Sequence, residues 1–88
     1  MAYKLDFSGQ ANKDIHFHQK SGDKTLLKKL FVLLEELTEH PTIGTGKPEQ
    51  LKRNLAGYWS RRINQEHRLV YKILDDDTVR VHSARGHY

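Results

Sequence analysis

One stretch of the chain, from Gly44 to Tyr71, holds nearly all the residues that can do chemistry. Its first part supplies one carboxylate, Glu49, and one lysine, Lys52, and its second part is a predicted β-hairpin that carries Arg61, Arg62 and Arg68. A carboxylate can accept a proton while arginines and lysines balance the negative charge of a phosphate. The stretch therefore indicates a site for phosphate chemistry.

Size and composition limit what else the chain can be. Its 88 residues form a single domain, residues 1–88, with one core. There is no cysteine, so packing rather than disulfides or thiolate-bound metal must hold the fold. The 15 Lys and Arg residues against 11 Asp and Glu give a net charge of +4, which favours a polyanionic partner. No apolar run is long enough to span a bilayer and the first residues do not resemble a signal peptide, so we expect a cytoplasmic protein with no membrane partner.

The hydrophobic pattern predicts an α+β fold with the element order β-α-α-β-β-β. Alternating apolar residues before Ser8 indicate a strand, and Ser8 itself can cap a first helix. The leucines after Asp23 recur at three- and four-residue spacing, which is typical of a core helix, and Pro41 ends it. In order, we expect a strand over 2–7, helices over 8–20 and 23–39, a hairpin centred on residue 65 and a last strand over 78–85.

The predicted hairpin buries the face formed by its odd-numbered residues, because these include nearly all of its apolar side chains. Consistent faces on both strands require a turn with an odd number of residues, centred on Gln65, which places Arg62 opposite Arg68. Directly opposed like charges destabilise a sheet, so an anion bound over the pair would explain it. A solvated basic strand face is the alternative. Arg61 is the misfit, since it is a cation on the apolar side.

Two neighbouring features have simpler interpretations. The Gly-Thr-Gly segment 44–46 lacks the spacing of a phosphate-binding P-loop, and we interpret it as a flexible approach to a helical turn at Pro48. In that setting Glu49 would be a helix-capping carboxylate instead of a catalytic group. His16 and His18 lie two apart on a predicted helix, so they face different directions and we expect no metal site.

The end of the chain returns to the arginines. The last strand must run antiparallel to the strand that carries Arg68, so its end comes back to the level of that residue and of the turn around Gln65. His87 could therefore reach the cationic face.

The run G-K-P-E-Q-L-K-R-N-L-A-G-Y-W-S-R-R-I-N-Q-E-H-R-L-V-Y, together with the terminal His87-Tyr88, resembles the Txe/YoeB family of bacterial toxins, within the RelE superfamily of ribosome-dependent mRNA interferases. The resemblance implies a RelE-like fold with two N-terminal helices packed on a twisted antiparallel sheet. It also implies the toxin of a type II toxin-antitoxin system, an endoribonuclease that cleaves mRNA in the ribosomal A site and inhibits translation. The implied partners are a cognate antitoxin of the YefM or Phd type, the ribosome with mRNA in its A site, operator DNA through the antitoxin complex, and a second copy in a homodimer. Neither a metal nor another cofactor is implied.

Carried onto this sequence, the family's motif gives the catalytic residues Glu49, Arg68, His87 and Tyr88 and the phosphate-binding residues Lys52 and Arg62. The carboxylate would accept the proton of the RNA 2′-hydroxyl, and the imidazole would protonate the departing 5′-oxygen. The cations would balance the charge that develops at phosphorus, and the terminal tyrosine would stack on a base or position the phosphate.

Two alternatives remain open at this point. One is a ParE-type protein of the same fold that inhibits DNA gyrase without cutting nucleic acid. The other is a non-catalytic RNA-binding module that uses the basic hairpin for affinity. The candidates for contacts to ribosomal RNA are Tyr58, Arg61, Lys28, Lys29 and Arg53, with a role in ordinary solubility as the alternative.

Overall fold

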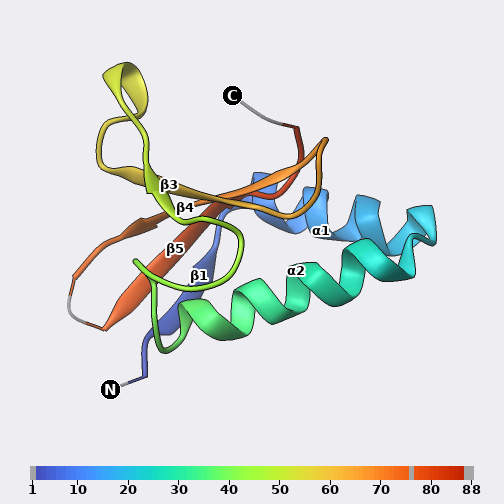
Figure 1. Cartoon of the computed structure of the whole chain (residues 1–88), viewed down its shortest axis with the longest axis horizontal. Helices are drawn as coiled ribbons and strands as arrows, with labels where there is room; N and C mark the ends of the chain where they lie inside the picture. Colours follow the sequence, from blue (N-terminus) through green and yellow to red (C-terminus); the bar gives the residue numbers. More distant parts are fainter. Residues whose placement is uncertain (1, 76, 87–88) are drawn as a thin grey trace.

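The computed structural model describes residues 2–75 and 77–86, and it packs two helices on one face of a five-stranded sheet (Figure 1). The strand order is β1-β5-β4-β3-β2, and all neighbours are antiparallel except β1, which runs parallel to β5. The α+β fold expected from the sequence is thus confirmed, with one short strand, β2, added. In chain order the elements are β1 (Lys4–Phe7), α1 (Gly9–Ser21), α2 (Lys24–Leu37), β2 (Glu49–Gln50), the 3₁₀ turn η1 (Arg53–Leu55), β3 (Tyr58–Arg62), β4 (Arg68–Ile73) and β5 (Thr78–Ser83).

Both helices begin at residues whose side chains satisfy free backbone N–H groups. The Ser8 hydroxyl accepts from the third residue of α1 at 3.0 Å, and the Asp23 carboxylate does the same for α2 at 3.0 Å. Gly22 ends α1 in the left-handed conformation, with φ of 78°, which glycine adopts without steric cost. Neither helix in the described part of the chain is long and apolar enough to cross a membrane.

The core lies between the helices and the odd-numbered residues of the sheet. Buried leucines of α2 pack against this face, as their spacing predicted, and burying each of them is worth about 1.5–3 kcal/mol. Trp59 and Ile73 pack against the same cluster while remaining partly exposed. The expected buried face of the sheet is therefore confirmed: its buried members are Ile63, Leu69 and Tyr71 of the hairpin and Val79 and Val81 of β5.

The hairpin has the register expected from its parity. Arg62 is the Cα partner of Arg68, and the turn between them is centred on Gln65. The backbone N–H of Ile63 donates to the carbonyl of His67 at 2.9 Å, which closes the turn. The two arginines therefore lie side by side on the sheet face opposite the core-facing, odd-numbered residues.

A β-bulge in β5 was not expected. Tyr71 pairs with Val81, but the preceding residue, Val70, pairs with Ser83, so one residue of β5 is extra. The bulge reverses which face the end of β5 presents. Ala84 consequently joins the buried core, although the parity of the strand before the bulge would turn it outward.

The segment that leads to Glu49 differs from expectation. It contains no helical turn at Pro48, because Glu49 and Gln50 instead pair with the edge of β3 opposite Ser60 and Trp59. The edge strand offers unpaired backbone groups, which an extended segment satisfies and a helical turn would not. The alternative of a helix-capping carboxylate is wrong for the same reason.

Candidate active site

A buried arginine, Arg61, holds in place the loop that leads to Glu49, the candidate base. Arg61 is 0% exposed, and its guanidinium donates to the Glu36 carboxylate at 2.8 Å and to the Tyr71 hydroxyl at 3.1 Å. It also donates to three loop carbonyls, those of His40, Ile43 and Thr45. A buried cation without partners would be very costly, so these five hydrogen bonds make the misfit residue a structural anchor. The expectation that Arg61 contacts ribosomal RNA is wrong, because the side chain is enclosed.

The loop is also held from α2, so it is not the flexible approach that its glycines suggested. The Thr45 backbone and hydroxyl donate to the Glu36 carboxylate at 2.8 and 2.6 Å. These bonds, the hydroxyl first, and the Arg61 guanidinium hold the pKa of Glu36 below its ordinary value. At Gly46, with φ of 84°, a Cβ would come within 2.9 Å of the Arg62 carbonyl oxygen. Glycine is required there because the loop approaches β3 so closely.

Glu49 and Arg68 meet on the open face of the sheet. Arg68 Nη1 donates to Glu49 Oε1 at 3.2 Å and to the Ser60 hydroxyl at 3.3 Å. The Glu49 side chain is 59% exposed and that of Arg68 is 21% exposed, so both groups remain within reach of a ligand. Two of the predicted catalytic residues, separated by 19 positions in the chain, thus form an ion pair.

The two predicted phosphate-binding residues are both exposed and lie next to the strands that carry this pair. Arg62 is exposed at the end of β3, directly opposite Arg68. Lys52 is exposed just after β2, and within the described residues no ion pair joins it to Glu49. The other two predicted catalytic residues, His87 and Tyr88, lie outside the described residues.

The chain just before those two residues does reach the site. The backbone N–H of Arg68 donates to the carbonyl of Gly86 at 2.8 Å, and the N–H of Gly86 donates to His67 Nδ1 at 3.0 Å. The C-terminal segment therefore returns to the level of Arg68, as the strand order expected from the sequence required.

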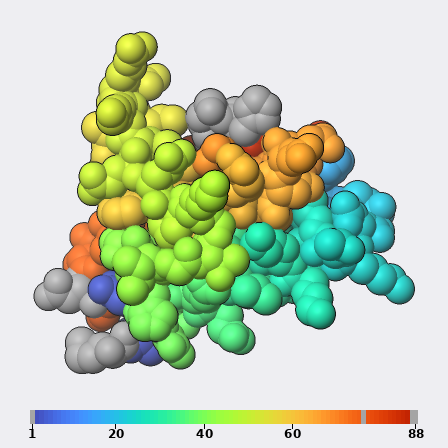
Figure 2. Space-filling view, viewed as in Figure 1, coloured from blue at the N-terminus to red at the C-terminus, as the bar shows by residue number. Residues whose placement is uncertain are grey.

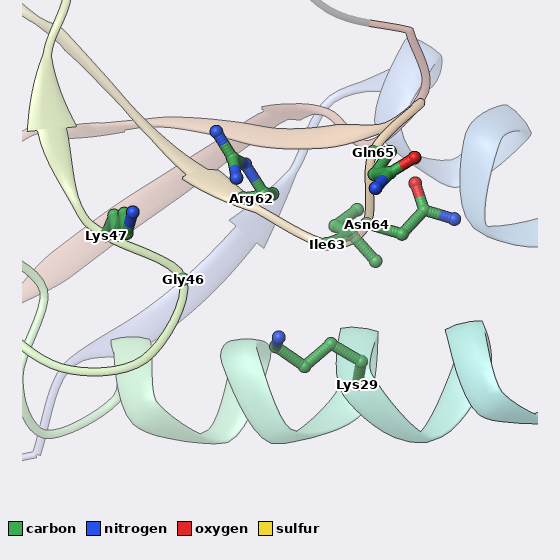
Figure 3. Close-up of a pocket in the computed structure, with 7 residues that line it drawn as sticks. All are labelled: Lys29, Gly46, Lys47, Arg62, Ile63, Asn64 and Gln65. Carbon is green, nitrogen blue, oxygen red and sulfur yellow. The ribbon is translucent and has the colours of Figure 1, made fainter.

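A cationic pocket lies next to Arg62, between α2, the 46–47 segment and the β3–β4 turn (Figure 3). It has a volume of about 390 Å³, and three of its lining side chains are positively charged while none is acidic. The residues that line the pocket are Lys29, Gly46, Lys47, Arg62, Ile63, Asn64 and Gln65.

The space-filling view shows the 3₁₀ turn η1 projecting from the body of the molecule, away from the helices (Figure 2).

Histidines do not gather into a metal site in the part of the chain that the structure describes. His16 is exposed and His18 is buried, so the two residues face different directions, as their spacing on α1 predicted. Within residues 2–75 and 77–86 there is no group of three His, Asp or Glu side chains placed to bind one ion.

Sequence reasoning missed Ser60. Its hydroxyl is buried at the centre of the site and orients Arg68, but a serine on an open strand face carries no signal by itself. Arg61 did carry a signal, since a cation on an apolar face must find internal partners. That signal indicated a structural role for the residue, not the RNA contact that we assigned to it.

Fold and site together define a small α+β protein with an open cationic sheet face on which the Glu49 carboxylate meets Arg68. A protein from Synechocystis sp. named toxin YoeB is 48% identical over 85 residues, covering 97% of this chain and 96% of its own. A solved YoeB/ParE toxin from Agrobacterium tumefaciens is 38% identical with a TM-score of 0.90, covering 97% of this chain and 99% of its own. Staphylococcus aureus YoeB, solved as a dimer, is 44% identical with a TM-score of 0.86 and full coverage of both chains; its complex with YefM has a TM-score of 0.83 at 43% identity and the same coverage.

Residues 7–88 match the family described as YoeB-like toxin of bacterial type II toxin-antitoxin system. The chain belongs to this family, and it is the toxin component of such a system.

Proposed function

We propose that this toxin is a ribosome-dependent endoribonuclease that cleaves mRNA in the A site and so inhibits translation. The observation that carries the proposal is the Glu49 carboxylate held 3.2 Å from the Arg68 guanidinium on the open face of the sheet. Family membership supports an mRNA-cleaving activity, and the site supplies groups suited to it.

The cleavage step follows from what the RNA backbone requires. Glu49 removes the proton of the 2′-hydroxyl, whose oxygen attacks the adjacent phosphorus in line with the departing 5′-oxygen. The phosphorus–5′-oxygen bond breaks, and His87 supplies the proton that the 5′-oxygen takes up. The products are a 2′,3′-cyclic phosphate and a free 5′-hydroxyl. Tyr88 positions the phosphate or stacks on a base.

The ion pair prepares both partners for this step. A phosphate that binds Arg68 competes with Glu49 for the guanidinium, which frees the carboxylate to act as a base. Arg68 then balances the additional negative charge at phosphorus, a contribution typically worth about 2.7–4 kcal/mol for one well-placed donor. The buried Ser60 hydroxyl keeps Arg68 oriented while this exchange takes place. Arg62 and Lys52 hold the neighbouring phosphates.

Cations and an aromatic residue near the site suit binding to ribosomal RNA and mRNA. Lys29 and Lys47 flank the pocket beside Arg62, and Arg53 lies on the projecting η1 turn. On the open face the Tyr58 ring contacts the His82 ring with centroids 5.2 Å apart, offering an aromatic surface for a base. Affinity that comes from such phosphate contacts should weaken as salt rises.

The remaining partners follow from the relatives. Staphylococcus aureus YoeB forms a complex with YefM and has also been solved as a dimer. We propose a YefM-like antitoxin for this chain, a homodimer as its free form, and operator binding through the antitoxin complex in the cytoplasm.

The test maps new 5′ ends on mRNA bound to ribosomes in a purified translation reaction. Wild type should cut in the A site, while Glu49→Gln and His87→Gln should each lower the rate by about 100-fold or more. Glu35→Gln, which changes an exposed glutamate on α2, serves as the matched control and should cut like wild type. Absence of any cut by the wild-type protein would refute the nuclease, as a gyrase inhibitor or a simple RNA-binding module requires. Cleavage by both site variants at the wild-type rate would instead refute the roles given to Glu49 and His87.

A further inference from the structure

A polar cluster behind the C-terminal segment is not used by the chemistry above. It comprises Asp14 and His18 on α1 and His67 in the β3–β4 turn. Asp14 and His18 are only 2% and 1% exposed. Polar groups are buried at a cost unless they are hydrogen-bonded, so the partners of these side chains indicate what they do.

All three side chains bind the backbone that leads to the end of the chain. Asp14 Oδ2 accepts from the N–H of Ala84 at 2.9 Å, and His18 Nε2 lies 2.7 Å from the Ala84 carbonyl oxygen. One helix therefore holds both backbone groups of Ala84. His67 Nδ1 accepts from the N–H of Gly86 at 3.0 Å, and Gly86 is joined in turn to the backbone of Arg68.

The β-bulge in β5 makes this arrangement possible. Without the extra residue, the parity of β5 would turn Ala84 toward the open face, beyond the reach of α1. With it, Ala84 is fully buried beside α1, and Gly86 lies against Arg68.

We infer that Asp14, His18 and His67 are positioning residues that fix residues 84–86, and so set the point from which the proton donor at the end of the chain is delivered to the Glu49–Arg68 pair. The inference rests on the proposed function, because it assigns the proton donor to His87. A misplacement of about 1 Å in a catalytic group can cost about 100-fold in rate, so an anchor one residue away has large leverage.

The anchor at Gly86 depends on the protonation state of His67. An N–H can donate only to an unprotonated ring nitrogen, so Nδ1 of His67 must carry no proton while this bond exists. The groups that face the ring are His18 and Asp14 from α1, Glu66 beside it in the turn, and Arg85 from the C-terminal segment. Burial, and then the neighbouring His18 at a ring-centroid distance of 4.7 Å, lower the pKa of His67, which keeps Nδ1 free to accept.

Substitutions separate positioning from simple structural support. His67→Leu removes the acceptor, whereas His67→Asn offers an amide oxygen in place of Nδ1 that does not titrate. We expect His67→Leu to lower the single-turnover rate on ribosomes about tenfold or more while the half-saturating concentration stays within about twofold. His67→Asn should recover most of the rate.

A second pair of variants tests α1 in the same assay. His18→Leu removes the donor to Ala84 and should also slow cleavage, while His18→Gln keeps an N–H donor and should recover it. His16→Leu, at an exposed histidine of the same helix, should behave like wild type. Wild-type rates for both His67→Leu and His18→Leu would overturn the inference.

A measurement on the unsubstituted protein keeps the inference testable even if a variant fails to fold. In an NMR titration, the Gly86 amide resonance should shift with the same midpoint as the His67 ring. An amide that does not respond while His67 titrates would overturn the anchor. Because no ribosome is present, this result stands apart from the proposed function, which fails only if the wild-type protein cuts no mRNA.

Discussion

Two arginines on adjacent strands of one hairpin have opposite environments. Arg61 on β3 turns toward the helices, is fully buried and makes five hydrogen bonds from its guanidinium. Arg68 on β4 turns toward the open face, and its described side-chain hydrogen bonds engage only Nη1, with Glu49 and Ser60 as acceptors. An arginine has five N–H donors, so the first residue is saturated by the protein while the second keeps donors for a ligand.

The contrast shows how one residue type serves two purposes within a few positions. Arg61 organises the loop that carries Glu49 into place, and Arg68 meets the same Glu49 on the other side of the sheet. The two arginines carry the same charge, and what distinguishes them is that the protein uses all the N–H donors of Arg61 but leaves donors of Arg68 for a ligand. Substitutions at the two sites should therefore damage different properties.

The largest effect on folding should come from Arg61→Met. The change leaves the Glu36 carboxylate and the loop carbonyls without their shared donor, and we expect a loss of about 3–5 kcal/mol in the free energy of unfolding. Denaturant unfolding measures this. Arg62→Met, at the exposed neighbour on the same strand, is the control and should change stability by no more than about 0.5 kcal/mol. Similar losses in both variants would contradict the structural role of Arg61.

Arg68→Lys should impair cleavage much more than it impairs folding. The lysine keeps the charge but loses the planar fork, so we expect cleavage on ribosomes to slow by about 10–100-fold. Unfolding free energy should fall by less than about 1 kcal/mol, because lysine keeps the charge and the Glu49 partner is 59% exposed to water. Single-turnover cleavage and denaturant unfolding of the same preparation test both statements. A stability loss as large as that of Arg61→Met would remove the distinction between the two arginines.

The smallest effect concerns the anchor of the loop at α2. The folded-state pKa of Glu36 lies below its ordinary value of 4.5, so the stabilisation is fully present above that pH and is lost as pH falls through the folded pKa. Thr45→Val removes the hydroxyl that contributes most to the shift, and it should cost about 1 kcal/mol at pH 7. The difference in the free energy of unfolding between Thr45→Val and wild type should be smaller near pH 3 than at pH 7. A difference in the free energy of unfolding that stays constant with pH would show that the ionised Glu36 carboxylate is not involved.

Much of the fold followed from local pattern, and so did the pairing of Arg62 with Arg68. Parity alone set the turn around Gln65, because a slip by one residue would move every apolar side chain of one strand to the wrong face. The short strand β2 left no such trace, since two residues carry no periodicity and their pairing depends on the free edge of β3. The bulge in β5 depends on the docking of Ala84 against α1, which is a tertiary contact that strand parity does not report.

The parallel pairing of β1 with β5 joins segments about as far apart as the chain allows, with Lys4 opposite Thr78. Contacts between such distant segments form late, because the entropy of closing a long loop is lost before the contacts can stabilise the chain. While this protein is being synthesised, β1 leaves the ribosome long before its partner exists, and β4 likewise waits for β5. The nascent polypeptide therefore cannot complete its sheet before β5 has been synthesised, so the sheet face that carries the Glu49–Arg68 pair is finished only after that point.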